Sequence, residues 1–443
     1  MKKIIQIAIY PALAILLLCG FAGCKKNFNN PNAATSSLVL NSAKGLMGTA
    51  IGIQKVYLAN VAYGISDANG LTTKETFLLN SGNTSELQLT KGGTFVDGTN
   101  ALLGNIWSSA NKCIYDANNV IDGAAKLGDK GYASGLIAYA SITKALSIGG
   151  LSMLWEKVPD TIGTISNPTV FIDRVQGFNK AIATIDKALA AVSANPISSG
   201  FLTDLPAGLL TTPGGTGADI GNILNALKAR FLLLSGNYTA ALAAANAVDL
   251  TKKYSFNSDP SSPNPIYFSV TSTNNLYQPV DSTLGLPVSI APDLADKRVP
   301  FYTSINAIIA PRFRLNGFWA AATTAIPIYL PGEMTLIKAE SYARAATPDL
   351  INAVVELNKI VTKQPSADPF GVGAALPAVA PVTQADVLTQ IYRNRCIELY
   401  LSGLKLEDMR RFGRPNSERT RNLMPYPFRE RDSNSNTPAD PAF

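Results

Sequence analysis

The sequence has no histidine among its 443 residues, and this absence excludes several kinds of catalytic site. It rules out nucleophile systems that depend on histidine and zinc sites of the HExxH type. Charged residues make up only 16% of the chain, too few for a nucleic-acid-binding arm. We therefore expect neither a nucleic-acid partner nor a cofactor. Glycoside hydrolysis by a carboxylate pair needs no histidine and stays open.

Cysteine is also scarce, with four residues in the whole chain. Cys19 lies in an N-terminal apolar segment, and Cys24 follows that segment directly. Cys113 and Cys396 lie in helical patterns among apolar neighbours, so we expect both to be buried thiols. Pairing of these two remains open in an oxidising compartment.

The N-terminus has the pattern of a lipoprotein signal peptide over residues 1–23. Two lysines precede the apolar stretch 4–18, and Phe-Ala-Gly stands immediately before Cys24, which we predict to be the lipidated residue. A membrane-spanning anchor is the alternative, but the apolar stretch is shorter than the ~20 residues of a span. Pro11 also interrupts it.

The polar, Asn-rich residues 24–37 are expected to form a tether between the lipid and the rest of the chain. Loss of the signal peptide removes two lysines and no acidic residue from a chain of net charge +7. The remaining positive charge includes an Arg-rich C-terminal end, expected to be a salt-bridged and solvated face: Arg410, Arg411, Arg414, Arg419 and Arg421.

Helical periodicity dominates the rest of the sequence. It predicts helices over 40–63, 103–127, 132–155, 175–192, 220–234, 238–248, 334–345, 350–361, 385–401 and 404–412. Long polar connections are expected at 64–100, 195–219, 251–330 and 364–382. Connections of this length usually carry function.

One predicted helix pair has the small residues of a tetratricopeptide repeat, which let two antiparallel helices approach closely. Its small or apolar positions are Ala229, Leu232, Ala241, Ala245 and Val248. A second segment repeats the pattern at Ala339, Tyr342, Ala353 and Leu357. The pairs are not in tandem, so we expect a helical scaffold decorated with loops and not a regular solenoid.

Several short motifs are weak signals. The SxxK matches Ser109/Lys112, Ser141/Lys144 and Ser402/Lys405 have no accompanying KTG and are attributed to chance. The run 214–217 is glycine-rich but lacks the context of a phosphate loop. Asp67 with Asn69, and Asp97 with Asn100, have oxygen ligands suited to calcium, but turn formation is their commoner use.

The C-terminal segment RCIELYLSGLKLEDMRRFG, residues 395–413, resembles the pattern of the SusD/RagB family of Bacteroidetes outer-membrane lipoproteins. PIYLPGEMTLIKAE at 327–340 and YPFRER at 426–431 also resemble segments of that family. Trp107, Tyr115 and Asn118 match its early helix. The matched segments occur in the family's order along the chain.

Within this pattern we expect two ion pairs at i,i+3 spacing on two helices separated by Gly403: Arg395–Glu398 and Asp408–Arg411. Three residues depart from the family's usual Glu, Glu and Arg: Asn394, Ser402 and Lys405. These departures are expected to weaken an ion network and not an active site.

The resemblance implies a mainly α fold in which tetratricopeptide-like helix pairs support loop-rich insertions. We predict a signal peptide at 1–23, a tether at 24–37 and one SusD-like domain at 38–443, with insertions at 64–100, 195–219 and 251–330.

The implied function is that of a non-enzymatic protein, lipid-anchored in the outer membrane, that binds oligosaccharides or peptides. It would deliver them to a SusC-like TonB-dependent transporter. Lys25 and Lys26 follow Cys24 where surface-exported members often carry acidic residues, so the exposed face stays open. An envelope-assembly scaffold and a carboxylate-dependent glycan hydrolase are the alternatives.

Sugar binding needs aromatic faces and polar side chains. Trp107 and Trp155 are interpreted as structural, because they match helix and turn positions. The candidate ligand-binding residues are Trp319, Phe318, Tyr302 and Tyr277 from the 251–330 insertion, and Phe95, Asn80 and Asn83 from the 64–100 insertion.

Overall fold

The computed structural model describes residues 39–161, 163, 167–205, 216–271, 275–308, 310 and 312–443. The predicted signal peptide, the lipidation site Cys24 and the tether lie outside these residues. The chain from Leu40 to Phe443 groups as one unit by its internal contacts.

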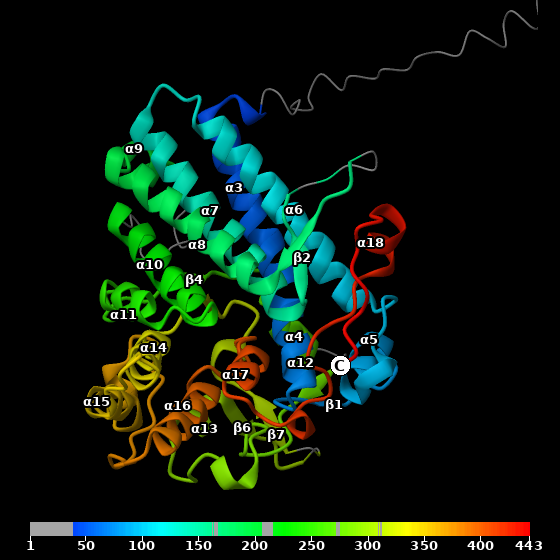
Figure 1. The fold of residues 1–443 in the computed structure, drawn as a ribbon, viewed down its shortest axis with the longest axis vertical. Coiled ribbons are helices and arrows are strands. Elements are labelled where there is room, and N and C mark those ends of the chain that lie inside the picture. The colour runs from blue at the N-terminus through cyan, green and yellow to red at the C-terminus, as the bar shows by residue number, and fades with distance from the viewer. Residues whose placement is uncertain are drawn as a thin grey trace, which may run out of the picture. The chain divides into compact units, whose positions relative to one another are not determined.

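The described chain is mainly α-helical, which confirms the predicted fold class (Figure 1). Its helices are α3 (Ala43–Val56), α4 (Tyr63–Thr72), α5 (Thr84–Lys91), α6 (Ala101–Ala124), α7 (Lys130–Leu154), α8 (Arg174–Ala194), α9 (Ser199–Asp204), α10 (Gly217–Leu234), α11 (Tyr238–Asn246), α12 (Pro265–Thr271), α13 (Arg298–Tyr302), α14 (Pro331–Ala343), α15 (Leu350–Val361), α16 (Gln384–Glu398), α17 (Lys405–Arg411) and α18 (Phe428–Ser433). A π-helical segment, Tyr57–Ala62, joins α3 to α4.

The strands are short and pair antiparallel in twos. The pairs are β1 (Phe77–Leu78) with β5 (Tyr277–Gln278), β2 (Lys157–Pro159) with β3 (Phe171–Asp173), β4 (Ser255–Phe256) with β8 (Ile326–Pro327), and β6 (Thr303–Ile305) with β7 (Phe313–Leu315). Three of the pairs lie in the loop-rich part of the chain, while β2 and β3 form a hairpin between α7 and α8.

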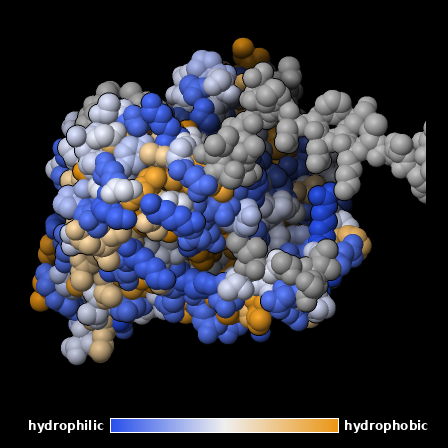
Figure 2. Space-filling model, turned by 90° about the horizontal axis from the view of Figure 1, so that it is seen from above, coloured by the Kyte–Doolittle hydropathy of each residue, from blue (hydrophilic) through white to orange (hydrophobic). Residues whose placement is uncertain are grey.

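The helices form a scaffold in which α7 is central. It packs between α6 and α8, and the scaffold continues through α10, α11, α14, α15 and α16 (Figure 1). Helix α7 is long and apolar enough to cross a membrane, but most of it is buried against these neighbours, as expected for a core helix. On the face seen in Figure 2, hydrophobic residues are interspersed with hydrophilic ones.

Short polar side chains set the starts of the scaffold helices. Asn100, Asp129, Asn237, Asp349 and Thr383 each accept a hydrogen bond from a backbone N–H in the first turn that follows. These bonds satisfy amide groups that have no partner inside the helix. The helix boundaries therefore follow local sequence, and they agree with the predicted ones to within a few residues.

The prediction that small residues lie at the contacts of the helix pairs is confirmed. Ala229, Ala241, Ala245, Ala339 and Ala353 are all completely buried. A comparable close approach joins α7 to α10, where a Cβ on Gly149 would come within 2.1 Å of the ring of Phe231. Small residues therefore set the distance between neighbouring helices, as the repeat pattern predicted.

The predicted loop at 64–100 is wrong over its first part, because α4 occupies residues 63–72 and is buried throughout most of its length. Its polar side chains serve buried hydrogen bonds to the turn after α16. Ser66 Oγ donates to Leu401 O at 2.7 Å, and Asn69 Nδ2 donates to Gly403 O at 2.9 Å. Polarity here marks a buried helix–turn contact and not exposure to solvent.

A buried ion network joins α14, α16 and α17. Glu340 accepts from Arg411 Nε at 2.7 Å and from Arg344 Nε at 2.8 Å, and Arg395 Nε lies 3.9 Å away. Arg395 also forms a 2.9 Å bond to Asp408, which binds Arg411 at 2.6 Å. The predicted Asp408–Arg411 pair is therefore present, within a larger network.

The predicted Arg395–Glu398 pair is wrong, because Glu398 faces another helix. It accepts from Lys363 Nζ at 2.5 Å and from Arg298 Nη1 at 3.2 Å. Asn394 joins the same site by accepting from Arg298 Nη2 at 2.8 Å. The two side chains of the expected pair thus belong to separate buried ion clusters.

The Arg-rich C-terminal end is salt-bridged, as predicted. The prediction that it is solvated is wrong. Arg411 and Arg410 keep only 7% and 11% of their side-chain surface exposed. Arg410 pairs with Glu407, which also pairs with Arg174 on α8. Four of the five arginine side chains, those of Arg410, Arg411, Arg419 and Arg421, are therefore largely shielded from solvent.

Cys113 and Cys396 are free and buried, so the prediction of unpaired thiols is confirmed. Burial raises the pKa of the Cys113 thiol to about 11 and that of Cys396 to about 12. Neither thiol is therefore appreciably ionised at neutral pH.

The substitution Glu340→Gln tests the ion network. Burial alone would raise the pKa of this carboxyl, but Arg411, Arg395 and Arg344 outweigh burial and lower it. Removing the negative charge leaves buried cations uncompensated, and we expect a loss of about 3–5 kcal/mol in unfolding free energy at pH 7. Because the folded pKa is depressed, the contribution is complete above about pH 4.3, the usual Glu value, and fades as pH falls through the folded pKa. Urea unfolding from pH 7 down to pH 3 measures both effects.

Lys359→Gln is the matched control. Lys359 pairs with Glu356 at 2.6 Å but keeps 58% of its side chain exposed. Exposed pairs contribute about 0–1 kcal/mol, so this variant is expected to unfold almost like the parent protein. Equal losses in the two variants would contradict a stabilising role for the buried network.

Candidate functional site

Four of the predicted ligand-binding aromatics lie in the interior. Tyr277 and Tyr302 have no exposed surface, while Trp319 and Phe318 are 3% and 9% exposed. Tyr302 stacks on Trp319 with ring centroids 5.8 Å apart, and Tyr302 Oη donates to Glu398 O at 2.5 Å. These rings are core residues in this structure and present no open face to a ligand.

Three of the four, Tyr302, Phe318 and Trp319, also line one small cavity. Its volume is about 110 Å³ and its walls are mainly apolar. Sites for small-molecule ligands usually measure about 300–1,000 Å³. The cavity is therefore too small for a sugar chain.

The other three predicted residues belong to the 64–100 region. Phe95 is 60% exposed beside Lys91, whose ammonium lies 5.2 Å from the ring centroid. Asn80 is exposed and accepts a hydrogen bond from the N–H of Gly82, while Asn83 donates to Asn80 O at 3.3 Å. The structure places the two asparagines together in one turn. It does not group Phe95 with the buried aromatic residues.

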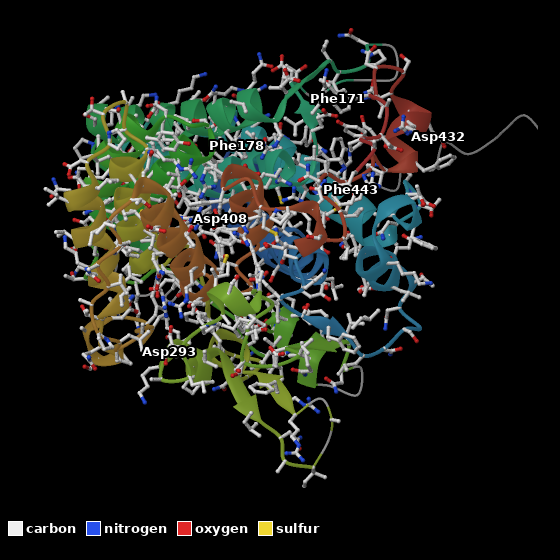
Figure 3. The ribbon with its side chains drawn as sticks, turned by 60° about the horizontal axis from the view of Figure 1, so that its bottom comes forward. Phe171, Phe178, Asp293, Asp408, Asp432 and Phe443 are labelled. Atoms are coloured by element: carbon white, nitrogen blue, oxygen red, sulfur yellow. The ribbon has the colours of Figure 1, made fainter. Side chains whose placement is uncertain are left out.

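A large groove lies elsewhere, along α6. This main groove has a volume of about 970 Å³ and is lined by the first half of α6, the β2–β3 hairpin and residues 427–434 around α18. Figure 3 shows the hairpin and α18 beside each other, with Phe171 and Asp432 labelled. Its size falls within the range of ligand sites, so we take it as the candidate functional site.

Trp107 forms part of the floor of the main groove, and an aromatic cluster packs behind it. The ring centroid of Trp107 lies 4.9 Å from that of Trp155, 5.8 Å from Tyr426 and 6.1 Å from Phe171. Trp155 Nε1 donates to Pro425 O at 2.8 Å. Trp107 and Trp155 are both buried, in agreement with their predicted structural role. The floor is consequently rigid.

Hydrogen bonds hold the α18 wall against this floor. Glu430 accepts from Trp107 Nε1 and from Asn434 Nδ2, each at 2.9 Å. Asn434 Nδ2 also reaches Thr169 O, in the hairpin, at 3.4 Å. Both carboxylate oxygens of Glu430 are therefore engaged in structure.

The loop before α6 closes the remaining side of the groove. Phe428 N donates to Gly98 O at 2.8 Å. Asp97 accepts from both the N–H and the hydroxyl of Thr99, and these bonds lower its pKa. Asp97 and Asn100 therefore shape a turn and a helix cap, which is the use that the sequence favoured over calcium binding.

Two aromatic rings in the main groove face solvent, and both were missed by the sequence interpretation. Tyr115 on α6 is 50% exposed and Phe428 on α18 is 57% exposed. Asn105 and Asn111 contribute amides to the same lining. Asn111 Nδ2 donates to Trp107 O at 2.9 Å, which fixes its orientation on the helix.

A signal for this site was present in the sequence. Trp107, Asn111 and Tyr115 are spaced by four residues, so they share one face of a helix. The pattern marks one wall of the groove. The spacing on α6 does not predict Phe428, which lines the same groove but lies more than 300 residues further along the chain.

Comparison with known proteins gives a consistent set of structural relatives. A SusD homolog from Bacteroides thetaiotaomicron matches with a TM-score of 0.68 at 12% identity, over 93% of this chain and 99% of its own. A SusD superfamily protein from Bacteroides vulgatus matches with a TM-score of 0.67 at 12% identity, over 91% and 100%. A SusD-like carbohydrate-binding protein from Bacteroides fragilis matches with a TM-score of 0.64 at 14% identity, over 85% and 87%.

These identities are low, so the likeness is one of fold. No protein-family model and no curated protein sequence matches the chain. The resemblance predicted from the sequence motifs is confirmed at the level of architecture over about nine-tenths of the chain.

Two glycine substitutions test how the main groove is closed. A Cβ on Gly98 would lie 2.7 Å from Tyr426 O and 3.2 Å from Phe428 N, so Gly98→Ala should displace the C-terminal segment. We expect a loss of about 1–3 kcal/mol. Gly104, on α6 in the same groove, has nothing within 4 Å of such a Cβ. Gly104→Ala should instead stabilise by about 0.5–1 kcal/mol. Thermal unfolding measures the stability of both variants. An unchanged unfolding temperature in Gly98→Ala would contradict the close contact at Gly98.

Proposed function

We propose that this chain, which has the SusD-like fold, is a lipid-anchored outer-membrane protein that captures oligosaccharides, or peptides, for import. In this proposal Cys24 carries the lipid, and a SusC-like TonB-dependent transporter receives the ligand. The support is the fold, shared with a carbohydrate-binding protein of Bacteroides fragilis, together with the lipoprotein pattern of the leader.

The observation that carries the binding role is the chemistry of the main groove. It combines the half-exposed rings of Tyr115 and Phe428 with the amides of Asn105 and Asn111. Aromatic faces pack against the apolar faces of sugar rings, and amides hydrogen-bond to their hydroxyls. A rigid floor under these groups limits the entropy lost when a ligand binds.

Binding is favoured over hydrolysis by the carboxylates of the groove. Two-carboxylate glycoside hydrolysis requires a pair about 5–9.5 Å apart across the scissile bond. Among the described residues that line the main groove, Glu430 is the one carboxylate, and its oxygens bind Trp107 and Asn434. This arrangement supports a structural role for Glu430.

Tyr115→Ala and Phe428→Ala test ligand binding in the main groove. Each substitution removes an exposed ring face, so we expect about tenfold weaker binding, which corresponds to ~1.4 kcal/mol. Calorimetry against a panel of oligosaccharides, with peptides as a second panel, measures the effect. Phe95→Ala is the control, because Phe95 is equally exposed but outside the lining of this groove. Unchanged affinity in both groove variants would move the site elsewhere.

The transporter partnership is tested separately. The tagged chain, extracted from its own cells in a mild detergent, should bring a large β-barrel transporter with it. Cys24→Ala should leave the chain outside the membrane fraction. Recovery of envelope-assembly proteins without a β-barrel would favour the scaffold alternative.

A further inference from the structure

A second groove continues from the main groove along α6. It has a volume of about 530 Å³ and lies between α6, α7 and α8. Asn111, Pro159 and Thr161 line both grooves, so the two share a boundary. Their α6 residues extend from Ala101 to Asp122, about 32 Å of helix at 1.5 Å per residue. A chain-like ligand in the main groove can therefore reach the second one.

Three lysines line this second groove: Lys144 from α7, and Lys180 and Lys187 from α8. Lys180 and Lys187 are two turns apart and therefore lie on the same face of α8. The acidic residues of the lining are Asp122 and Asp160. Positive charge thus exceeds negative charge in the second groove, which we name the basic groove.

The lysines differ in how far they are already neutralised. Lys180 Nζ binds the carboxylate of Asp160 at 2.6 Å and also donates to its carbonyl. Lys144 is half-buried, and its ammonium forms no hydrogen bond or ion pair with any other described residue. Burial, followed by the proximity of Lys187, lowers the pKa of Lys144, and Asp122 only partly opposes this.

A partly desolvated ammonium that has no acidic partner is energetically unfavourable. An anionic group of a ligand would remove this penalty and form a charge-assisted hydrogen bond. Ser141, one turn before Lys144 on α7, lines the same groove and carries a hydroxyl donor. The SxxK pattern at these two positions, attributed to chance in the sequence, thus places two donors on one groove wall.

We propose that the basic groove recognises a carboxylate or sulfate substituent, so that the captured ligand is an acidic oligosaccharide. This inference rests on the proposed function, because the sugar chain is held in the main groove while Lys144, Lys180 and Lys187 read its charge.

The experiment compares oligosaccharides of equal length that differ in the presence and type of their acidic groups. Oligogalacturonates, their fully methyl-esterified forms and sulfated oligosaccharides are titrated by calorimetry into the parent protein, Lys144→Gln and Lys144→Arg. We expect the acidic probes to bind at least tenfold more tightly than the ester and to weaken with added NaCl. Lys144→Gln should remove this preference, and Lys144→Arg should keep most of it. The stronger of the two acidic probes identifies the anion as carboxylate or sulfate.

Lys228→Gln is the control variant, since Lys228 pairs with Asp186 at 2.6 Å and lies outside the lining of both grooves. Its affinities should match those of the parent. Equal binding of acidic and esterified probes, or an unchanged preference in Lys144→Gln, would overturn the proposal. These results differ from failure of the proposed function, in which both Tyr115→Ala and Phe428→Ala leave every affinity unchanged.

A readout that needs no sugar chain covers the case in which no oligosaccharide binds. Galacturonate monomer and inorganic sulfate should raise the unfolding temperature of the parent protein more than that of Lys144→Gln. Equal stabilisation of the two proteins would contradict an anion site at Lys144.

Discussion

The buried negative charge of Glu340 has to be neutralised within the protein, and this requirement positions the elements around it. Arg411, Arg395 and Arg344 surround this fully buried carboxylate, and Asp408 completes the set. A buried ion is tolerated only when oppositely charged partners and hydrogen bonds replace the water that it loses. The requirement therefore fixes α14, α16 and α17 relative to one another, at the end of the scaffold where the C-terminal segment begins.

That position matters because the segment after α17 packs against α4–α7, in the N-terminal half of the described chain. Arg410 and Arg174 meet at Glu407, which ties α17 to α8. The chain then crosses α7, where Met424 N donates to Leu154 O at 2.9 Å, and Glu430 receives the indole N–H of Trp107. The wall of the main groove around α18 therefore comes from the last part of the sequence. The ion pairs of α17 hold the start of this segment against the scaffold.

In the proposed function, the two grooves divide the recognition of a ligand by chemistry. The main groove offers ring faces and amides, which suit a neutral, hydroxyl-rich surface, whereas the basic groove offers the ammonium groups of Lys144, Lys180 and Lys187. Neutral contacts supply most of the shape complementarity, and charge adds discrimination between related ligands. The continuity of the grooves along α6 lets one rigid helix present both, so no hinge or closing loop is required for both to act on one ligand.

The helices could be predicted from the sequence alone, because periodicity and N-caps act between residues that are close in the chain. The sequence also determined the buried state of Cys113 and the structural role of Trp107. The pairing of charges depends on the tertiary fold. Glu398 pairs with Arg298, which is 100 residues away in the chain, and not with Arg395 at i,i+3 spacing. The same holds for the binding surface. Exposure depends on what packs over a side chain, so Trp319 became core while Tyr115 remained open.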